Sequence, residues 1–204
     1  LRTPNLLHHG RYGASALVVM SALPLESDAG VAFDQMPDEL LARFTARYRS
    51  DGALASSPWF AGLPGRCAGV TDDVVRSAWD FFAEADDSEF AFEAWHGDWS
   101  PWNLGRTRAG EWCLWDWERT AIGVPRGFDQ VHRHVHYGTG LDAARTALTA
   151  VGVSEDRVEL TIGLYLLELA ARLIEGHAWN ADDDNPMRRE LSDSLRRIAA
   201  PAGS

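Results

Sequence analysis

The chain has 204 residues, 46% of them hydrophobic, which is enough to bury the core of one large domain. Its formal net charge of -11 argues against nucleic-acid binding, because a surface that binds phosphates needs a basic face. Cys67 and Cys113 match no Cys-x-x-Cys pattern, so neither a disulfide framework nor a zinc ribbon is indicated. The most apolar helical stretch, residues 160–174, is interrupted by Glu168 and Arg172. We therefore expect no membrane span, and the cytoplasm is the default location.

The first predicted element is a β-hairpin. Residues 5–8 and 16–20 would form its strands around a Gly-Arg-Tyr-Gly turn, and Pro24 ends the segment that follows. Residues 25–37 are typical of a loop, and residues 38–48 of a helix whose apolar side chains share one face. Residues 50–69 are rich in glycine and proline, so we expect a long irregular connection there.

A second helix is predicted from an N-cap at Thr71 to about Ala85. Its buried side would consist of Val74, Ala78, Phe81 and Phe82. Residues 90–95 predict a strand, and residues 104–106 and 111–115 predict a hairpin around a turn at 108–110. That hairpin would bring the residues at its two open ends, Asn103 and Asp116, to the same side.

Six of the nine tryptophans lie between residues 95 and 117. We favour core positions for Trp95, Trp112 and Trp115, whereas Trp99 and Trp102 fit either the core or the wall of a site. From residue 129 onward the pattern is helical, with helices over 129–137 and 141–151 and a long one from a Ser154 cap to Gly176. A last amphipathic helix begins at residue 185 or 186, and residues 201–204 form a tail.

The segment with the clearest chemistry is His96-Gly97-Asp98-Trp99-Ser100-Pro101-Trp102-Asn103, followed at 116–118 by Asp-Trp-Glu. Phosphoryl transfer needs such a set: one carboxylate accepts the proton of the attacking hydroxyl, and two oxygen ligands hold the magnesium that bridges the phosphates. Protein kinases place the Asp and Asn of their catalytic loop at the same separation. The alternative is a β-turn followed by a solvated acidic strand end.

This ordered combination resembles the aminoglycoside phosphotransferase and choline kinase family, which is related to the protein kinases. The resemblance implies that Asp98 is the catalytic base and that His96 braces its loop. It also implies that Asn103 and Asp116 bind Mg²⁺, with ATP as phosphoryl donor. Glu118 is expected just behind the metal ligands. The segment 123–129, Gly-Val-Pro-Arg-Gly-Phe-Asp, is similar to a further block of the family and adds Asp129 as a supporting residue, about one position later than usual.

The same resemblance implies an α+β, mainly helical fold: the C-terminal lobe of a protein-kinase-like fold, with a β-hairpin carrying the catalytic and metal residues. Residues 1–24 would be the end of the N-terminal lobe and the hinge, and residues 25–200 the C-terminal lobe. Adenine would lie against four residues of the hinge, Met20, Ser21, Ala22 and Leu23. The alternative is that the hairpin belongs to a complete small domain.

All 19 basic residues are arginine, and no Gly-x-Gly-x-x-Gly segment is present. The family supplies a glycine-rich loop and a lysine over the phosphates from its small lobe. We therefore expect most of that lobe to be missing upstream, and the 204-residue chain alone to bind magnesium-ATP weakly and transfer phosphate negligibly.

Two acidic or histidine-rich features have simpler interpretations. His132, His134 and His136 alternate along a predicted helix, and the first and last could bind zinc, but a structural hydrogen-bonding role for His132 is favoured. Residues 182–184, three aspartates, could attract a cationic acceptor or simply be a solvated charge cluster before the last helix.

The sequence therefore predicts an ATP- and magnesium-dependent phosphotransferase that acts on a hydroxyl of a small molecule, a cation being one option. Antibiotic, amino alcohol, sugar and modified nucleoside all remain open as acceptors, and the oligomeric state is undetermined. Two other hypotheses stay open: a catalytically silent kinase-like binding module, and a metal-dependent phosphohydrolase using the same carboxylates.

Overall fold

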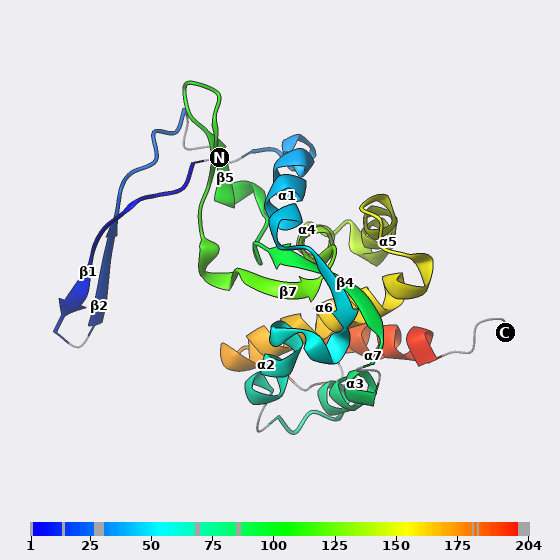
Figure 1. The fold of residues 1–204 in the computed structure, drawn as a ribbon. Helices are drawn as coiled ribbons and strands as arrows, with labels where there is room; N and C mark the ends of the chain where they lie inside the picture. The colour runs from blue at the N-terminus through cyan, green and yellow to red at the C-terminus, as the bar shows by residue number, and fades with distance from the viewer. Residues whose placement is uncertain are drawn as a thin grey trace.

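The computed structural model describes residues 2–13, 15–26, 31–67, 70–84, 87–180, 182 and 184–199. A three-stranded antiparallel sheet lies in the middle of the molecule (Figure 1). Its central strand, β4 (Glu89–Trp95), pairs with β3 (Ser50–Ala53) on one side and β7 (Ala121–Pro125) on the other. Phe90, Phe92 and residues 93–95 of β4 are buried, so the strand ends inside the molecule.

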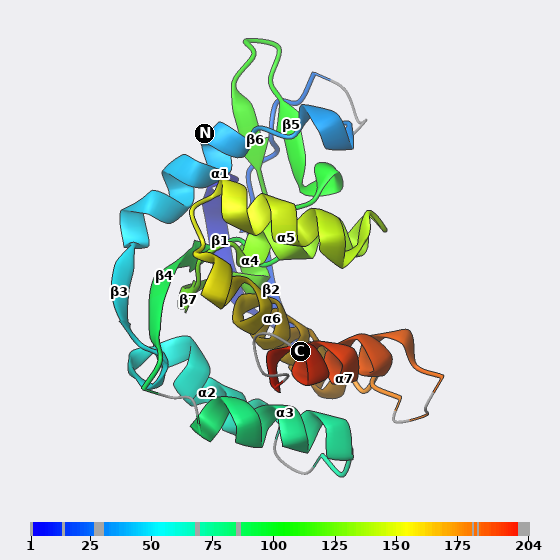
Figure 2. The same cartoon turned by 90° about the vertical axis from the view of Figure 1, so that its right-hand side faces the viewer.

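Helices pack around α6 (Glu155–Glu175), which is buried along most of its length. Figure 2 shows α6 surrounded by the other helices of the main core. It contacts α2 (Pro58–Arg66), α3 (Asp73–Glu84), α4 (Phe128–His136), α5 (Gly140–Ala150) and α7 (Pro186–Ala199). The predicted long helix is therefore confirmed, with Ser154 as N-cap and Gly176 as C-cap. No helix of the described residues is long and apolar enough to cross a membrane.

A second, smaller core lies between α1 (Asp38–Thr45) and the hairpin of β5 (Leu104–Arg106) and β6 (Trp112–Leu114). Its fully or nearly fully buried members are Met36, Leu41, Trp99, Leu104 and Leu114. The predicted hairpin is thus confirmed, and Trp99 belongs to the core, whereas Trp102 is 55% exposed. Of the three tryptophans assigned to the core, Trp95 is buried, but Trp112 and Trp115 are only half-buried.

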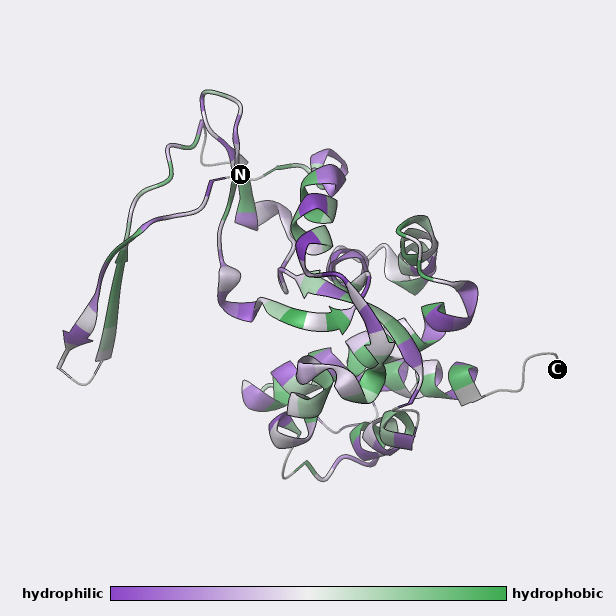
Figure 3. Cartoon of the chain, viewed as in Figure 1, coloured by the Kyte–Doolittle hydropathy of each residue, from purple (hydrophilic) through white to green (hydrophobic). Residues whose placement is uncertain are grey.

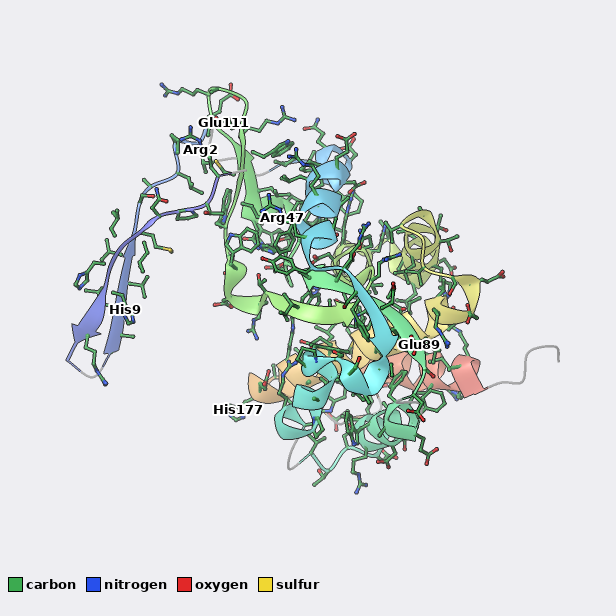
Figure 4. All side chains as sticks on the ribbon, in the orientation of Figure 1. Arg2, His9, Arg47, Glu89, Glu111 and His177 are labelled. Atoms are coloured by element: carbon green, nitrogen blue, oxygen red, sulfur yellow. The ribbon has the colours of Figure 1, made fainter. Side chains whose placement is uncertain are left out.

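The N-terminal hairpin of β1 (Leu6–Tyr12) and β2 (Ser15–Met20) projects away from the rest of the molecule (Figure 1). Figure 3 shows the hydrophobic colour along β2. The large apolar side chains exposed on the hairpin are Leu6 and Leu7 on β1 and Leu17, Val18, Val19 and Met20 on β2. An ion pair of 2.6 Å between Arg2 and Glu111 ties the start of the chain to the β5–β6 hairpin, whereas His9 lies far out on β1 (Figure 4).

The expectation of an irregular connection over residues 50–69 is wrong, because this segment holds β3 and α2. The Ser57 hydroxyl accepts a hydrogen bond from the amide of Phe60 at 3.1 Å, and Pro58 occupies the first helical position, which tolerates proline. Trp59, Phe60 and Leu63 are then buried in the main core. Their burial outweighs the cost of Pro64 within the helix.

The cap of α3 is Asp72 rather than Thr71. Its carboxylate accepts hydrogen bonds from the amides of Val74 at 2.9 Å and Val75 at 3.2 Å. Val75 lies in the core, where it is 1% exposed, whereas Val74, expected on the buried side, is only partly buried. Asp72 also accepts from Trp179 at 3.1 Å, so tertiary contacts decide between the two caps.

Candidate active site

The loop of residues 96–103 is held in place by a buried carboxylate on α4. Asp129 accepts hydrogen bonds from the backbone amides of His96 at 2.7 Å and Gly97 at 3.1 Å. Gly97 has a φ of +87°, and a Cβ there would lie 2.4 Å from the carbonyl oxygen of Arg119. Only glycine fits this position. Asp129, expected as a supporting residue, therefore fixes the backbone just before Asp98.

The Asp98 carboxylate is held at both oxygens. Asn103 Nδ2 donates to Oδ2 at 2.9 Å and to the backbone carbonyl of Asp98 at 3.0 Å, and His132 Nε2 lies 3.2 Å from Oδ1. Burial alone would raise the pKa of Asp98, but hydrogen bonds from His132, Ser100 and Asn103 outweigh it and lower the pKa well below its usual range. The side chain is 26% exposed, so an ionised, oriented proton acceptor faces solvent.

His96 acts as a brace in this geometry. Its Nε2 lies 3.0 Å from the carbonyl oxygen of Trp115, and its Nδ1 lies 3.4 Å from the amide nitrogen of Asp98. Burial lowers the pKa of His96, so the ring is neutral at pH 7. A neutral ring satisfies both contacts when Nε2 donates and Nδ1 accepts. His96 thus links the loop of residues 96–103 to the segment just before Asp116.

Asp116 follows β6 in an unusual backbone conformation, with φ 63° and ψ 58°. A left-handed conformation is rare for residues other than glycine and is often found at functional sites. The pairing of Leu104 with Leu114 and a 3.2 Å hydrogen bond from the Trp115 amide to the Asn103 carbonyl bring Asn103 and Asp116 to the same end of the hairpin. This part of the sequence-based prediction is confirmed for the backbone.

The oxygens at this end suit magnesium. Both hydrogen bonds of the Asn103 amide nitrogen go to Asp98, and within the described part of the chain no hydrogen bond uses Asn103 Oδ1 or the Asp116 carboxylate. Magnesium typically binds one or two protein oxygens together with phosphate and water oxygens. Among the described residues no group of three or more His, Cys, Asp or Glu side chains could hold a metal.

Two other predicted positions lie apart from this network. The Glu118 side chain is 68% exposed and pairs with Arg119 at 3.4 Å. Of the residues predicted to form a hinge, Ser21 is bonded to Asn5, just before β1: the Ser21 amide donates to the Asn5 carbonyl and the Asn5 amide to Ser21 Oγ, both at 2.9 Å. No hydrogen bond recorded in the described structure joins Met20, Ser21, Ala22 or Leu23 to the catalytic loop.

The contact of His132 with Asp98 could not be foreseen from the sequence. The sequence showed only that His132 and His136 share a helix face, and their ring centroids are indeed 4.1 Å apart. His134 points elsewhere, with its Nδ1 2.7 Å from the Thr139 hydroxyl. Spacing along α4 gives no information about which loop that face meets.

Sequence reasoning also missed a cation that supports the loop from α6. Arg172 donates to the carbonyl oxygen of Gly97 at 2.6 Å and to Glu168 at 2.8 Å. Glu168 is 2% exposed and also accepts from Trp59 Nε1 at 2.8 Å and Arg66 at 2.6 Å. Glu168 thus joins Trp59, Arg66 and Arg172 in one buried set of hydrogen bonds. The two residues that interrupt the apolar stretch of α6 therefore anchor the loop.

Aromatic side chains cluster where the loop of residues 96–103 meets the end of α4. Trp102, in this loop, has its ring centroid 5.7 Å from that of Tyr137. The ring centroid of Phe33 lies 4.6 Å from that of Tyr137. Burial and the charge of nearby Asp98 raise the pKa of Tyr137. Trp102 is 55% exposed, so this cluster reaches the surface.

No protein-family model and no curated protein matches the sequence. Comparison with solved structures finds crystal structures of LicA. The structure of LicA in complex with AMP is 13% identical over 94% of this chain and 72% of that chain, with a TM-score of 0.55. Choline kinase LicA from Streptococcus pneumoniae is 14% identical over 82% of this chain and 63% of that chain, with a TM-score of 0.48. The first similarity shows that this chain shares its fold with LicA, a choline kinase.

Proposed function

We propose that the protein is a small-molecule kinase that transfers the γ-phosphoryl group of ATP to a hydroxyl group. The observation that carries the proposal is the ionised, oriented carboxylate of Asp98, with Asn103 beside it and Asp116 at the same end of the hairpin. The likeness to a LicA structure that contains AMP supports a nucleotide as the donor.

In this reaction Asp98 accepts the proton of the acceptor hydroxyl as its oxygen attacks the γ-phosphorus. The bond from the γ-phosphorus to the bridging oxygen breaks, and its electron pair leaves with ADP. Asn103 Oδ1 and Asp116 would hold magnesium, which neutralises charge on the phosphates when bound. Because Asn103 holds Asp98 through its amide nitrogen, one side chain would align the base with the metal.

The nucleotide base would lie against the segment that follows β2. Met20, Ser21, Ala22 and Leu23 lead from the projecting hairpin back to the main body, where the Glu26 amide donates to the Arg106 carbonyl at 2.8 Å. We assign residues 1–24 to the hairpin and hinge, and residues 25–200 to the catalytic lobe. Glu118 has no part in this scheme beyond its position next to the metal ligands.

A cationic acceptor fits the surroundings of Asp98. Aromatic faces attract cations, and Trp102 and Tyr137 present such faces next to the proposed base. The net charge of -11 also favours a positively charged substrate. An amino alcohol such as choline, or an aminoglycoside, combines a cationic group with a hydroxyl. The aspartates at 182–184 add no support, since Asp183 lies outside the described residues.

The test is a panel assay. A protein that contains this chain together with the small lobe expected upstream is mixed with ATP and magnesium. ADP, free phosphate and phosphorylated acceptor are then followed for amino alcohols, aminoglycosides, sugars and nucleosides. We expect ADP and phosphorylated product only when the right acceptor is present. Phosphate release without an acceptor would instead support a phosphohydrolase. Magnesium-dependent nucleotide binding with no turnover on any acceptor would support a binding module.

A further inference from the structure

A chain of buried polar contacts runs from α6 to the Asp98 carboxylate. The Tyr165 hydroxyl lies 3.0 Å from His132 Nδ1, and His132 Nε2 lies 3.2 Å from Asp98 Oδ1. Tyr165 is 1% exposed and His132 4% exposed. The three residues come from three separate parts of the structure: α6, α4 and the catalytic loop.

The direction of these hydrogen bonds follows from charge. Burial is the main cause that lowers the pKa of His132, to about 4, so its ring is neutral at pH 7 and carries a single N–H. Asp98 is ionised and can only accept. Therefore the proton lies on Nε2 and is donated to Asp98, and Nδ1 accepts from the hydroxyl of Tyr165. Burial also raises the pKa of Tyr165, which keeps this hydroxyl protonated.

Other charged groups around His132 do not compete for this contact. His136 stacks on His132 from the same helix, and Arg172 lies nearby on α6. Both disfavour a positive charge on His132. Arg172 is itself engaged with Glu168 and the carbonyl of Gly97. Burial, His136 and Arg172 thus outweigh the opposite effect of Asp98 and keep the ring of His132 neutral.

We propose that His132 is a positioning residue for phosphoryl transfer, with Tyr165 selecting the tautomer that lets it hold Asp98. This inference rests on the proposed kinase function. His132 fixes Oδ1 from one side and Asn103 fixes Oδ2 from the other, so the carboxylate cannot rotate. An ionised carboxylate has further lone pairs, which remain for the acceptor hydroxyl. A carboxylate that is already held in the reactive orientation need not be reoriented when it accepts the proton.

The test combines four variants of α4 with one of α6. His132→Phe removes the donor, and His132→Gln restores an amide N–H near the place of Nε2. His134→Phe and His134→Gln are matched controls on the same helix, since His134 contacts Thr139 instead. Tyr165→Phe keeps the ring and removes only the hydroxyl. Circular dichroism melting of each variant separates loss of fold from loss of activity.

We expect His132→Phe to lower kcat by about tenfold or more, with the nucleotide Kd unchanged, because a misplaced base costs turnover rather than binding. His132→Gln should recover much of this loss, and the His134 variants should match the wild type. Tyr165→Phe should reduce kcat less than His132→Phe does.

A readout independent of turnover is the ¹⁵N NMR signal of the His132 ring. We expect the Nε2-protonated tautomer in the wild type and a mixture of tautomers in Tyr165→Phe. An active wild type whose folded His132→Phe variant keeps its kcat would overturn the positioning role. So would an Nδ1-protonated ring in the wild type. A wild type that phosphorylates no acceptor would overturn the proposed function itself, with the NMR result still deciding whether the hydrogen-bond chain is correctly assigned.

Discussion

The loop of residues 96–103 and the β1–β2 hairpin are held in place in different ways. Every residue of the loop from 96 to 103 is buried except Asp98, which is partly exposed, and Trp102. Its backbone is held by Asp129 from α4 and by Arg172 from α6. The hairpin pairs with itself from Leu6 to Met20 and exposes its large apolar side chains.

The two regions differ in what determines their conformation. The loop is ordered by polar contacts from elements far away in the sequence, so its shape depends on the whole fold. A two-stranded hairpin is only marginally stable by itself, and its exposed side chains stabilise little. We therefore expect substitutions in the loop to affect catalysis or stability strongly, and substitutions on the hairpin to affect stability weakly.

The largest effect is expected from Asp98→Asn. The amide keeps the size of the side chain but cannot accept the proton, so turnover should fall about 10²–10⁴-fold, with nucleotide affinity nearly unchanged. Steady-state kinetics with the acceptor found in the panel, together with calorimetry of nucleotide binding, measure the two quantities. A variant with near-wild-type turnover would remove Asp98 from the role of base.

The second prediction concerns the support beneath the loop. Burial raises the pKa of Asp129 to about 7, whereas an unfolded aspartate titrates near 3.9. The folded protein therefore holds this proton more tightly, and stability falls as pH rises from about 4 to about 7. Relative to Asp129→Asn, which does not titrate, the wild type should lose about 1.4 kcal/mol of unfolding free energy per pH unit in this window.

Urea unfolding of both proteins at several pH values between 4 and 7 measures this difference. If the difference in free energy of unfolding between the wild type and Asp129→Asn stays constant with pH, Asp129 is ionised throughout this range. The loop would then be held by a charged carboxylate.

The third prediction compares two neighbouring acidic residues. Asp116→Ala should weaken magnesium-dependent nucleotide binding by about tenfold, which corresponds to about 1.4 kcal/mol of lost metal contact. Glu118→Ala is the control, because its side chain is 68% exposed and pairs only with Arg119 in the described structure. Nucleotide affinity is measured for both variants during a magnesium titration. A larger loss of affinity in Glu118→Ala than in Asp116→Ala would make Glu118 the metal ligand instead.

The smallest effect is expected on the hairpin. Val18 is 52% exposed on β2, and Val18→Ala should change the free energy of unfolding by less than about 0.5 kcal/mol. Val124→Ala is the matched change on β7, where the side chain is fully buried, and it should cost about 1–3 kcal/mol. Equal losses in thermal or urea unfolding would mean that the hairpin is packed against more than the described contacts show.

The sequence by itself determined the features that depend on local pattern. The separation of Asp98 from Asn103, and the hairpin before Asp116, placed the proposed base and metal ligands at one end of β5 and β6. The apolar periodicity of α6 identified a helix that runs through the core. Such patterns are readable because they repeat with the period of a strand or a helix, whatever the rest of the chain does.

Only the tertiary structure decided which distant residues meet. The glycine and proline content of residues 50–69 predicted a loop. The helix α2 forms there because Trp59, Phe60 and Leu63 are buried in the main core. The contacts of His132 with Asp98 and of Arg172 with Gly97 join residues 34 and 75 positions apart. Buried polar groups need hydrogen-bond partners, and the tertiary structure determines which residues are near enough to serve. The spacing of residues along the sequence does not predict these partners.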